Sequence, residues 1–313
     1  MSYILSAVSD CGFRHSVNQD SVLVRKLQSA HGEMVFACIC DGMGGLQYGE
    51  LASATLVSCF DDWLDTDLPE ILSRSDCEEE LRSRWQALID RAGNLMRTFA
   101  EQTGATLGTT LSALLLWQNR GFIANIGDTR VYEIGKTVQI LTRDHTFVRE
   151  EIDAGRMTPE QAACSGKEHI LTRCVGVRED ANADFYRITG KKKTLYLLCS
   201  DGFRHKISPE EMHEQLSGKT TAAALESAHS FCAVANAAKK TTFRWSRFWQ
   251  TAPRKDFFRG FSGKKRRPSM QAAYRQSKKS FSPIPRIFST KIRTTIRCRN
   301  IRQCLKTAFC VSV

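Results

Sequence analysis

The order in which strand-like and helix-like patterns follow one another constrains the fold of this chain most. Short apolar or alternating runs bounded by Gly, Asn or Asp predict strands at 3–8, 21–27 and 34–40. Apolar residues at helical spacing then predict two long helices at 48–64 and 77–103. Further strands are predicted at 110–116, 121–126, 131–134, 138–141, 184–188 and 194–199, with a polar helical insertion at 146–163. This order predicts an α+β sandwich with outer helices and disfavours a doubly wound parallel sheet.

The charge divides the chain into two unlike parts. The net charge is +12 and the isoelectric point is near 9.2, which taken alone would indicate nucleic-acid binding. Residues 1–225 contain 24 basic and 31 acidic residues, a net charge of −7, whereas residues 226–313 contain 21 and 2, a net charge of +19. The acidic body therefore has no nucleic-acid signature, and a domain boundary is predicted near residue 226.

Composition narrows the class of protein further. The chain has 313 residues, of which 42% are hydrophobic, yet it contains no run of about 18 apolar residues and its N-terminus lacks the pattern of a signal peptide. The 12 cysteines are scattered, several of them within apolar runs. These features predict a soluble cytoplasmic protein without a membrane span and with reduced thiols.

Three of the predicted strands end at an aspartate that has a glycine beside it: Asp41 with Gly42, Asp128 with Gly127, and Asp201 with Gly202. Any one of these pairs is typical of a plain turn. Several carboxylates that meet at one sheet edge, however, repel one another unless cations neutralise them, and their hard oxygen atoms suit Mg²⁺ or Mn²⁺. Together the three pairs predict a two-metal site.

The N-terminal segment adds two candidate site residues. Arg14 has the planar guanidinium that can hold a phosphate through two hydrogen bonds, and Asp20 directly precedes a predicted strand. Alone, Arg14 would be taken for a surface charge.

In this order the motifs resemble the PPM-type, PP2C-like metal-dependent protein serine/threonine phosphatases of the compact bacterial kind. The resemblance covers residues 1–225. The matching segments are Arg14 with 18–20 (NQD), 41–45 (DGMGG), 108–110 (GTT), 127–130 (GDTR), 141–145 (LTRDH), 170–173 (ILTR) and 200–202 (SDG).

The resemblance implies a fold and a set of metal ligands. The implied fold is a central β-sandwich of two antiparallel sheets flanked by α-helices, with the metal cluster at one edge. The implied ligands of two or three Mn²⁺ or Mg²⁺ ions are Asp20, Asp41, the carbonyl group of Gly42, Asp128 and Asp201. Asp41 would bridge two ions, and Asp128 would act chiefly at a third, weaker site.

The resemblance also implies the chemistry. Arg14 would hold the substrate phosphate while a metal-bridging water attacks phosphorus in line, without a phosphoenzyme. Residues 146–185 resemble the mobile flap of the family, although a surface insertion without a role in substrate access is the other interpretation. His145 is a candidate for protonating the leaving group or contacting substrate, and an ordinary loop histidine is the alternative.

The family pattern breaks after Ser200-Asp201-Gly202. A complete member continues to an Asp-Asn or Asp-Asp pair that opens the last strand and supplies a metal ligand. The last aspartate in this sequence is Asp256, and no apolar strand follows it. One metal ligand and the last strand of the sandwich are therefore expected to be missing.

The basic segment 226–313 has two interpretations. Its sparse acids and lack of periodicity suit a disordered tail, and an alternative frame of the codons for 238–245 permits EKDDISV, the expected ligand segment. In this first interpretation, segment 226–313 is the product of out-of-frame translation. The other interpretation is a functional tail whose KKRRPS run binds nucleic acid or an anionic membrane.

Two functions follow from these observations. The first is hydrolysis of phosphoserine and phosphothreonine in proteins that a bacterial serine/threonine kinase phosphorylates, carried out by a monomer. The second is an inactive, truncated remnant of such a phosphatase, with a tail that binds anionic partners or nothing.

The gene sequence tests the frame hypothesis directly. We expect the codons for 220–250 to encode an Asp-Asp or Asp-Asn strand in another frame. If none of the three frames does so, the tail is genuine protein sequence.

Overall fold

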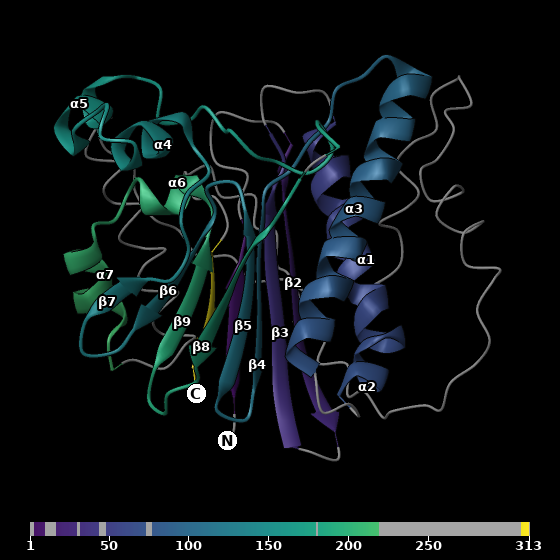
Figure 1. Ribbon diagram of the computed structural model, residues 1–313. Coiled ribbons are helices and arrows are strands. Elements are labelled where there is room, and N and C mark those ends of the chain that lie inside the picture. Colours follow the sequence, from purple (N-terminus) through teal and green to yellow (C-terminus); the bar gives the residue numbers. More distant parts are fainter. Residues whose placement is uncertain are drawn as a thin grey trace, which may run out of the picture.

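The computed structural model describes residues 3–9, 17–29, 32–43, 48–72, 77–179, 181–218 and 308–312 (Figure 1). Two antiparallel five-stranded sheets form its centre. The first has the strand order β2-β3-β4-β5-β8 and the second the order β1-β10-β9-β6-β7. This architecture confirms the predicted α+β sandwich.

Each sheet combines strands from separate parts of the chain. The first sheet consists of β2 (Asp20–Ser29), β3 (Gly32–Asp41), β4 (Leu111–Trp117), β5 (Arg120–Ile126) and β8 (Asp184–Thr189). The second consists of β1 (Ile4–Val8), β10 (Ala308–Ser312), β9 (Leu195–Cys199), β6 (Arg130–Ile134) and β7 (Val138–Ile140). Each predicted strand is present, with its ends shifted by at most two residues.

Helices cover the outer faces of the sandwich (Figure 1). The first sheet carries α1 (Gly49–Thr66), α2 (Leu68–Ile71) and α3 (Cys77–Thr103). The second carries α6 (Asp201–Arg204) and α7 (Pro209–Leu216). The helices α4 (Phe147–Asp153) and α5 (Pro159–Cys164) lie in the segment between β7 and β8 and make up the predicted polar insertion.

The alternation of side chains along β3 explains the layers. Val35, Ala37 and Ile39 face the second sheet and join the core between the sheets. The intervening residues, such as Phe36, face α1 and α3 in a separate core. There Phe36 stacks on Phe60 with ring centroids 5.3 Å apart and meets the edge of Trp85. Because both faces of β3 are buried, its register is strongly specified.

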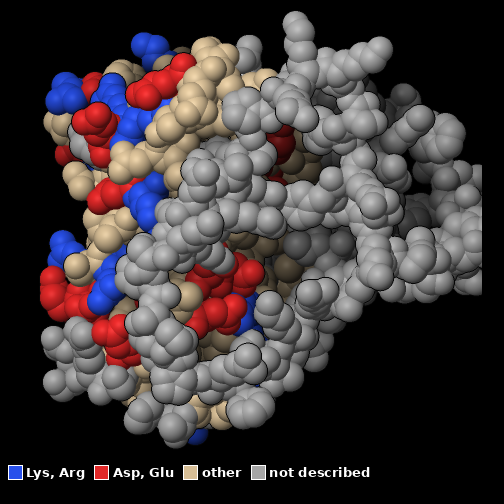
Figure 2. All heavy atoms as spheres, turned by 90° about the vertical axis from the view of Figure 1, so that its right-hand side faces the viewer, with Lys and Arg blue, Asp and Glu red and all other residues tan. Residues whose placement is uncertain are grey.

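The charged surface of the described part carries both signs. On the face that Figure 2 shows, acidic and basic side chains are interspersed over the described residues. Both signs are expected there, because residues 1–225 contain 24 basic and 31 acidic residues. Among the described helices, none is long and apolar enough to span a membrane.

The expectation that the last strand is missing was wrong. Ala308–Ser312 forms β10, which pairs antiparallel with both β1 and β9. A gap between β1 and β9 would leave two rows of backbone groups without partners inside a sheet, and β10 fills it. The strand nevertheless brings no carboxylate, because residues 257–313 contain no Asp or Glu. Residues 219–307 lie outside the described residues.

The position of β10 predicts the effect of a proline within it. Cys310 pairs with Ser6 of β1 and with Leu197 of β9. Cys310→Pro removes a ladder N–H and should lower the free energy of unfolding by on the order of 3 kcal/mol relative to Cys310→Ala, which keeps that group. Urea denaturation of both variants measures the difference. Equal stability of the two would show that this segment does not lie in the sheet.

Candidate metal centre

Two buried carboxylates face each other at the end of the β2–β3 ladder. Asp20 is the first residue of β2, Asp41 is the last residue of β3, and the antiparallel register makes them partners. Their exposed fractions are 9% and 8%. Like charges this close and this far from water are unfavourable without a compensating cation or hydrogen-bond donors. The arrangement is therefore suited to binding a divalent cation.

The backbone around Asp41 is held rigidly. The Asp41 carbonyl oxygen accepts hydrogen bonds from the Thr110 N–H at 2.9 Å and from the Thr109 hydroxyl at 3.1 Å. The Gly42 N–H donates to the carbonyl oxygen of Gln19 at 3.0 Å. A Cβ atom on Gly42 would lie 2.1 Å from the carbonyl oxygen of Gly49, so only glycine fits there.

The second sheet reaches the same place through Ser200. This fully buried residue follows β9, and its hydroxyl donates to Asp20 Oδ2 at 3.0 Å. Ser200 is also the N-cap of α6, whose first residue is Asp201. The start of β2 thus meets the ends of β3 and β9, and the sequence predicted the meeting of the two strands that end at Asp41 and Asp201. The hydroxyl bond from Ser200 was not predicted, because its partner is 180 residues away in the chain.

Asp128 forms a buried ion pair that the sequence did not indicate. Its Oδ2 lies 2.9 Å from Arg204 Nη2, and the two side chains are 8% and 9% exposed. Burial raises the pKa of Asp128, and Arg204 opposes this shift while Asp201 and Asp144 add to it. The same guanidinium lies 3.9 Å from Asp144. Arg204 therefore balances the charge of this second carboxylate group.

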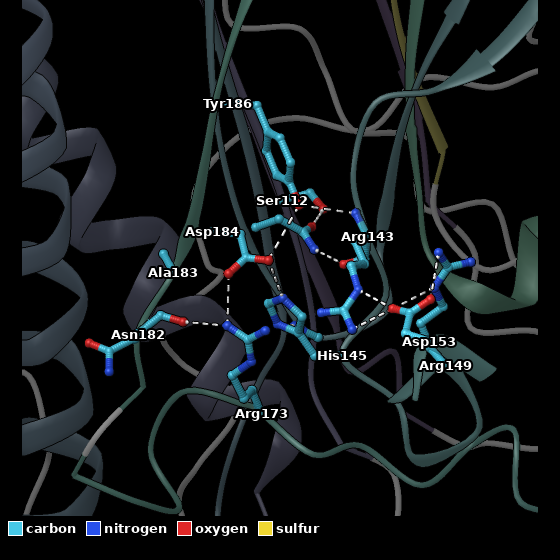
Figure 3. A network of polar contacts seen from close by, with 12 residues as sticks. Ser112, Arg143, His145, Arg149, Asp153, Arg173, Asn182, Ala183, Asp184 and Tyr186 are labelled. Carbon is cyan, nitrogen blue, oxygen red and sulfur yellow. Dashed lines mark hydrogen bonds and ion pairs between the residues drawn. The ribbon is translucent and has the colours of Figure 1, made fainter. Parts of the chain in front are cut away.

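His145 lies in a buried network rather than at a substrate surface (Figure 3). Its ring is fully buried, Nδ1 accepts the Gly127 N–H at 3.1 Å, and Nε2 lies 3.0 Å from Asp184 Oδ2. Because Nδ1 accepts, the proton is on Nε2 and is donated to Asp184. Both nitrogen atoms are thus engaged inside the protein. This corrects the expectation that His145 protonates a leaving group or contacts substrate.

The same network joins the two ends of the predicted flap. Asp184, near the end of the predicted segment, begins β8, and its Oδ1 accepts a hydrogen bond from Arg173 at 2.8 Å. Near the other end, Arg143 pairs with Asp153 of α4, as Figure 3 shows. Burial lowers the pKa of His145 and raises that of Asp184, but hydrogen bonds from His145 and Arg173 bring the pKa of Asp184 below its ordinary value.

The donor set fits hard divalent cations. It consists of the carboxylates of Asp20, Asp41 and Asp201 at the meeting point of the strands, with Asp128 and Asp144 beside them. The metal roles of these residues and of the Gly42 carbonyl group stay predictions. Arg14 lies outside the described residues. His169 and His205 lie close to Asp201, a grouping that the sequence did not reveal because His169 comes from a separate segment.

A double-mutant cycle tests the buried ion pair. Arg204→Met leaves Asp128 buried and unpaired, and it should lower the free energy of unfolding by about 3–5 kcal/mol. Adding Asp128→Asn should restore part of this loss. Urea denaturation in EDTA measures both effects without compensation by metal ions. Arg156→Met, which breaks the exposed pair with Glu151, is the control and should change little. A small loss for Arg204→Met would contradict the predicted coupling.

The lowered pKa of His145 predicts a pH dependence of stability. Because the folded pKa lies below the unfolded value of about 6.5, the unfolded chain binds the proton more readily. The contribution of His145 to stability should therefore be lost as pH falls below about 6.5. Burial and the positive charges of Arg173 and Arg143 lower the pKa of His145, whereas Asp184 raises it and so opposes this loss. Urea denaturation from pH 8 to pH 5 should show a shallower pH slope for His145→Gln. Parallel curves below pH 6.5 would contradict this.

Comparisons with known proteins identify protein phosphatases as the relatives of this chain. The family described as Protein phosphatase 2C matches residues 13–240, which extends past the boundary predicted near 226. The protein phosphatase PhpP of Streptococcus pneumoniae is 29% identical over 67% of this chain and 82% of its own length. The serine/threonine phosphatase stp of Listeria monocytogenes is 32% identical over 58% and 72%. The catalytic domain of the phosphatase PstP, solved with 2 manganese ions, superposes with a TM-score of 0.61 at 28% identity, over 74% and 92%.

Proposed function

This chain belongs to the protein phosphatase 2C family, and we propose that it hydrolyses phosphoserine and phosphothreonine at the edge where β2, β3 and β9 meet. It is a metal-dependent protein serine/threonine phosphatase, and its substrates are phosphorylated proteins. The observation that carries the proposed site is the buried pair Asp20–Asp41, joined to the end of β9 by Ser200.

The residues of the chain have separate tasks in the proposed mechanism. Asp20, Asp41, Asp201 and the Gly42 carbonyl group would hold the metal ions. Ser200 orients the Asp20 carboxylate by its hydrogen bond, and Thr109 and Thr110 fix the backbone of Asp41. When bound, divalent ions supply a water of lowered pKa as the nucleophile. Arg14 would hold the phosphate group, because a guanidinium can donate two parallel hydrogen bonds to it.

We assign two ions of Mn²⁺ or Mg²⁺ to this edge. The oxygen donors support a hard cation, and the related PstP domain was solved with 2 manganese ions. A third ion at Asp128 would have to compete with the bond from Arg204, so we expect it to bind more weakly.

The setting that we infer is the bacterial cytoplasm, where the protein acts as a monomer on targets of a serine/threonine kinase. The named relatives from Streptococcus and Listeria support a bacterial signalling role. For segment 226–313 outside β10, a functional basic tail and an out-of-frame product are both candidate interpretations.

The lack of an acidic residue on β10 supports a second candidate function. The strand occupies its place in the sheet without supplying the expected aspartate, which supports a phosphatase domain weakened or inactivated in this form. Restoring the alternative frame around codon 238 should then raise activity.

Hydrolysis of p-nitrophenyl phosphate and of a phosphothreonine peptide tests the proposed function. We expect hydrolysis that requires added Mn²⁺ and disappears with EDTA. Asp41→Asn should reduce the rate at least about 100-fold, because it removes one of the two facing carboxylates. The matched control Glu79→Gln, on the exposed face of α3, should keep the rate. Hydrolysis that persists in Asp41→Asn would place the reaction elsewhere, and a wild type without activity would favour the inactive remnant.

A further inference from the structure

Three side chains with metal-binding groups meet beside the end of β9. His169, Asp201 and His205 each offer one ligand atom, and these atoms lie within 4.8 Å of one another. Among the described residues, no other set of three such side chains has its ligand atoms this close together. Both histidines are exposed and Asp201 is half-buried, so an ion from solvent can reach the group.

Two separate segments bring the group together. Asp201 is the first residue of α6 and His205, four residues later, is its C-cap, whose N–H donates to the Asp201 carbonyl oxygen at 3.0 Å. This spacing puts their side chains on one helix face. His169 comes from the segment between α5 and β8, and its ring meets that of His205 edge-on with centroids 5.5 Å apart.

The chemistry of this group differs from that of the neighbouring carboxylates. Two imidazole rings and one carboxylate form a mixed nitrogen and oxygen donor set, which transition-metal ions prefer over Mg²⁺. The strand beside the group adds no acidic ligand, since β10 begins at Ala308 opposite Cys199 and no Asp or Glu follows Asp256 in the chain. Within the described residues, the ligand atoms that group most closely with Asp201 are the imidazole nitrogen atoms of His169 and His205.

Arg204 limits how an ion can bind. Its Nη1 donates to His205 Nε2 at 2.9 Å. An ion therefore uses Nδ1 of His205 or displaces the guanidinium from Nε2. In either case the ring remains a ligand, because imidazole has two nitrogen atoms that can bind metal.

We propose that His169, Asp201 and His205 bind a divalent transition-metal ion, with Zn²⁺ as the best match to two imidazoles and a carboxylate. This proposal depends on the proposed function in one respect only: Asp201 would also hold a metal ion at the catalytic edge. An ion held here joins the segment between α5 and β8 to α6, so that metal binding orders the flap next to the catalytic carboxylates.

Metal binding by the full chain tests this site independently of catalysis. EDTA-treated protein is titrated with Zn²⁺ alone, and with Co²⁺, whose visible absorption reports nitrogen ligands. Wild type should bind Zn²⁺ and give a nitrogen-ligated Co²⁺ spectrum. His169→Gln/His205→Gln should lose that spectrum and bind Zn²⁺ at least about tenfold more weakly. His213→Gln, in α7 and outside the group, is the matched control and should behave as wild type.

Further variants separate this proposal from the proposed function. Asp41→Asn should keep the Co²⁺ spectrum even though it loses phosphatase activity. His205→Asp exchanges nitrogen for oxygen and should retain bound Zn²⁺ with an altered Co²⁺ spectrum, which decides the matter if the double variant fails to fold. The proposal is overturned if wild type shows no nitrogen-ligated Co²⁺, or if the double variant binds both ions as wild type does.

Discussion

Two buried carboxylates, Asp20 and Asp41, face each other at the end of the β2–β3 ladder, and their repulsion determines what must surround them. In a medium of low dielectric constant, two such charges are stable only with hydrogen-bond donors and a cation nearby. Ser200 supplies one donor from the second sheet. The sandwich therefore does more than bury apolar residues, because it brings the ends of strands from both sheets to one charged edge.

Charge balance next to this edge depends on residues from the opposite half of the chain. Arg204, just after β9, neutralises Asp128, just after β5, and both are buried. Beside them, His145 bonds the Gly127 backbone and Asp184, so the ends of the flap segment are tied to the sheet that carries the site (Figure 3). The flap thus starts and ends at fixed points, and α4 and α5 lie between them.

The strongest local patterns predicted the elements most closely. The helix at 77–103 has the bounds that its apolar spacing indicated, and its buried face includes Leu81, Trp85 and Ile89. By contrast, β10 was not predicted, because a five-residue strand in an unperiodic basic segment has no local signal. Its place follows from the need of β1 and β9 for a partner between them. Likewise, no spacing in the sequence relates Arg204 to Asp128 or His169 to His205.

The fold class and the carboxylates at the strand ends could be predicted from the sequence, because alternation, helical spacing and Asp-Gly turns act over a few residues. It also determined the family, through motifs in a fixed order. Three features became visible only in the folded chain: His145 is a buried anchor, Asp128 has a cation partner, and residues 308–312 complete the second sheet. These contacts join residues far apart in the chain, where sheet register and burial, and not local pattern, determine which groups meet.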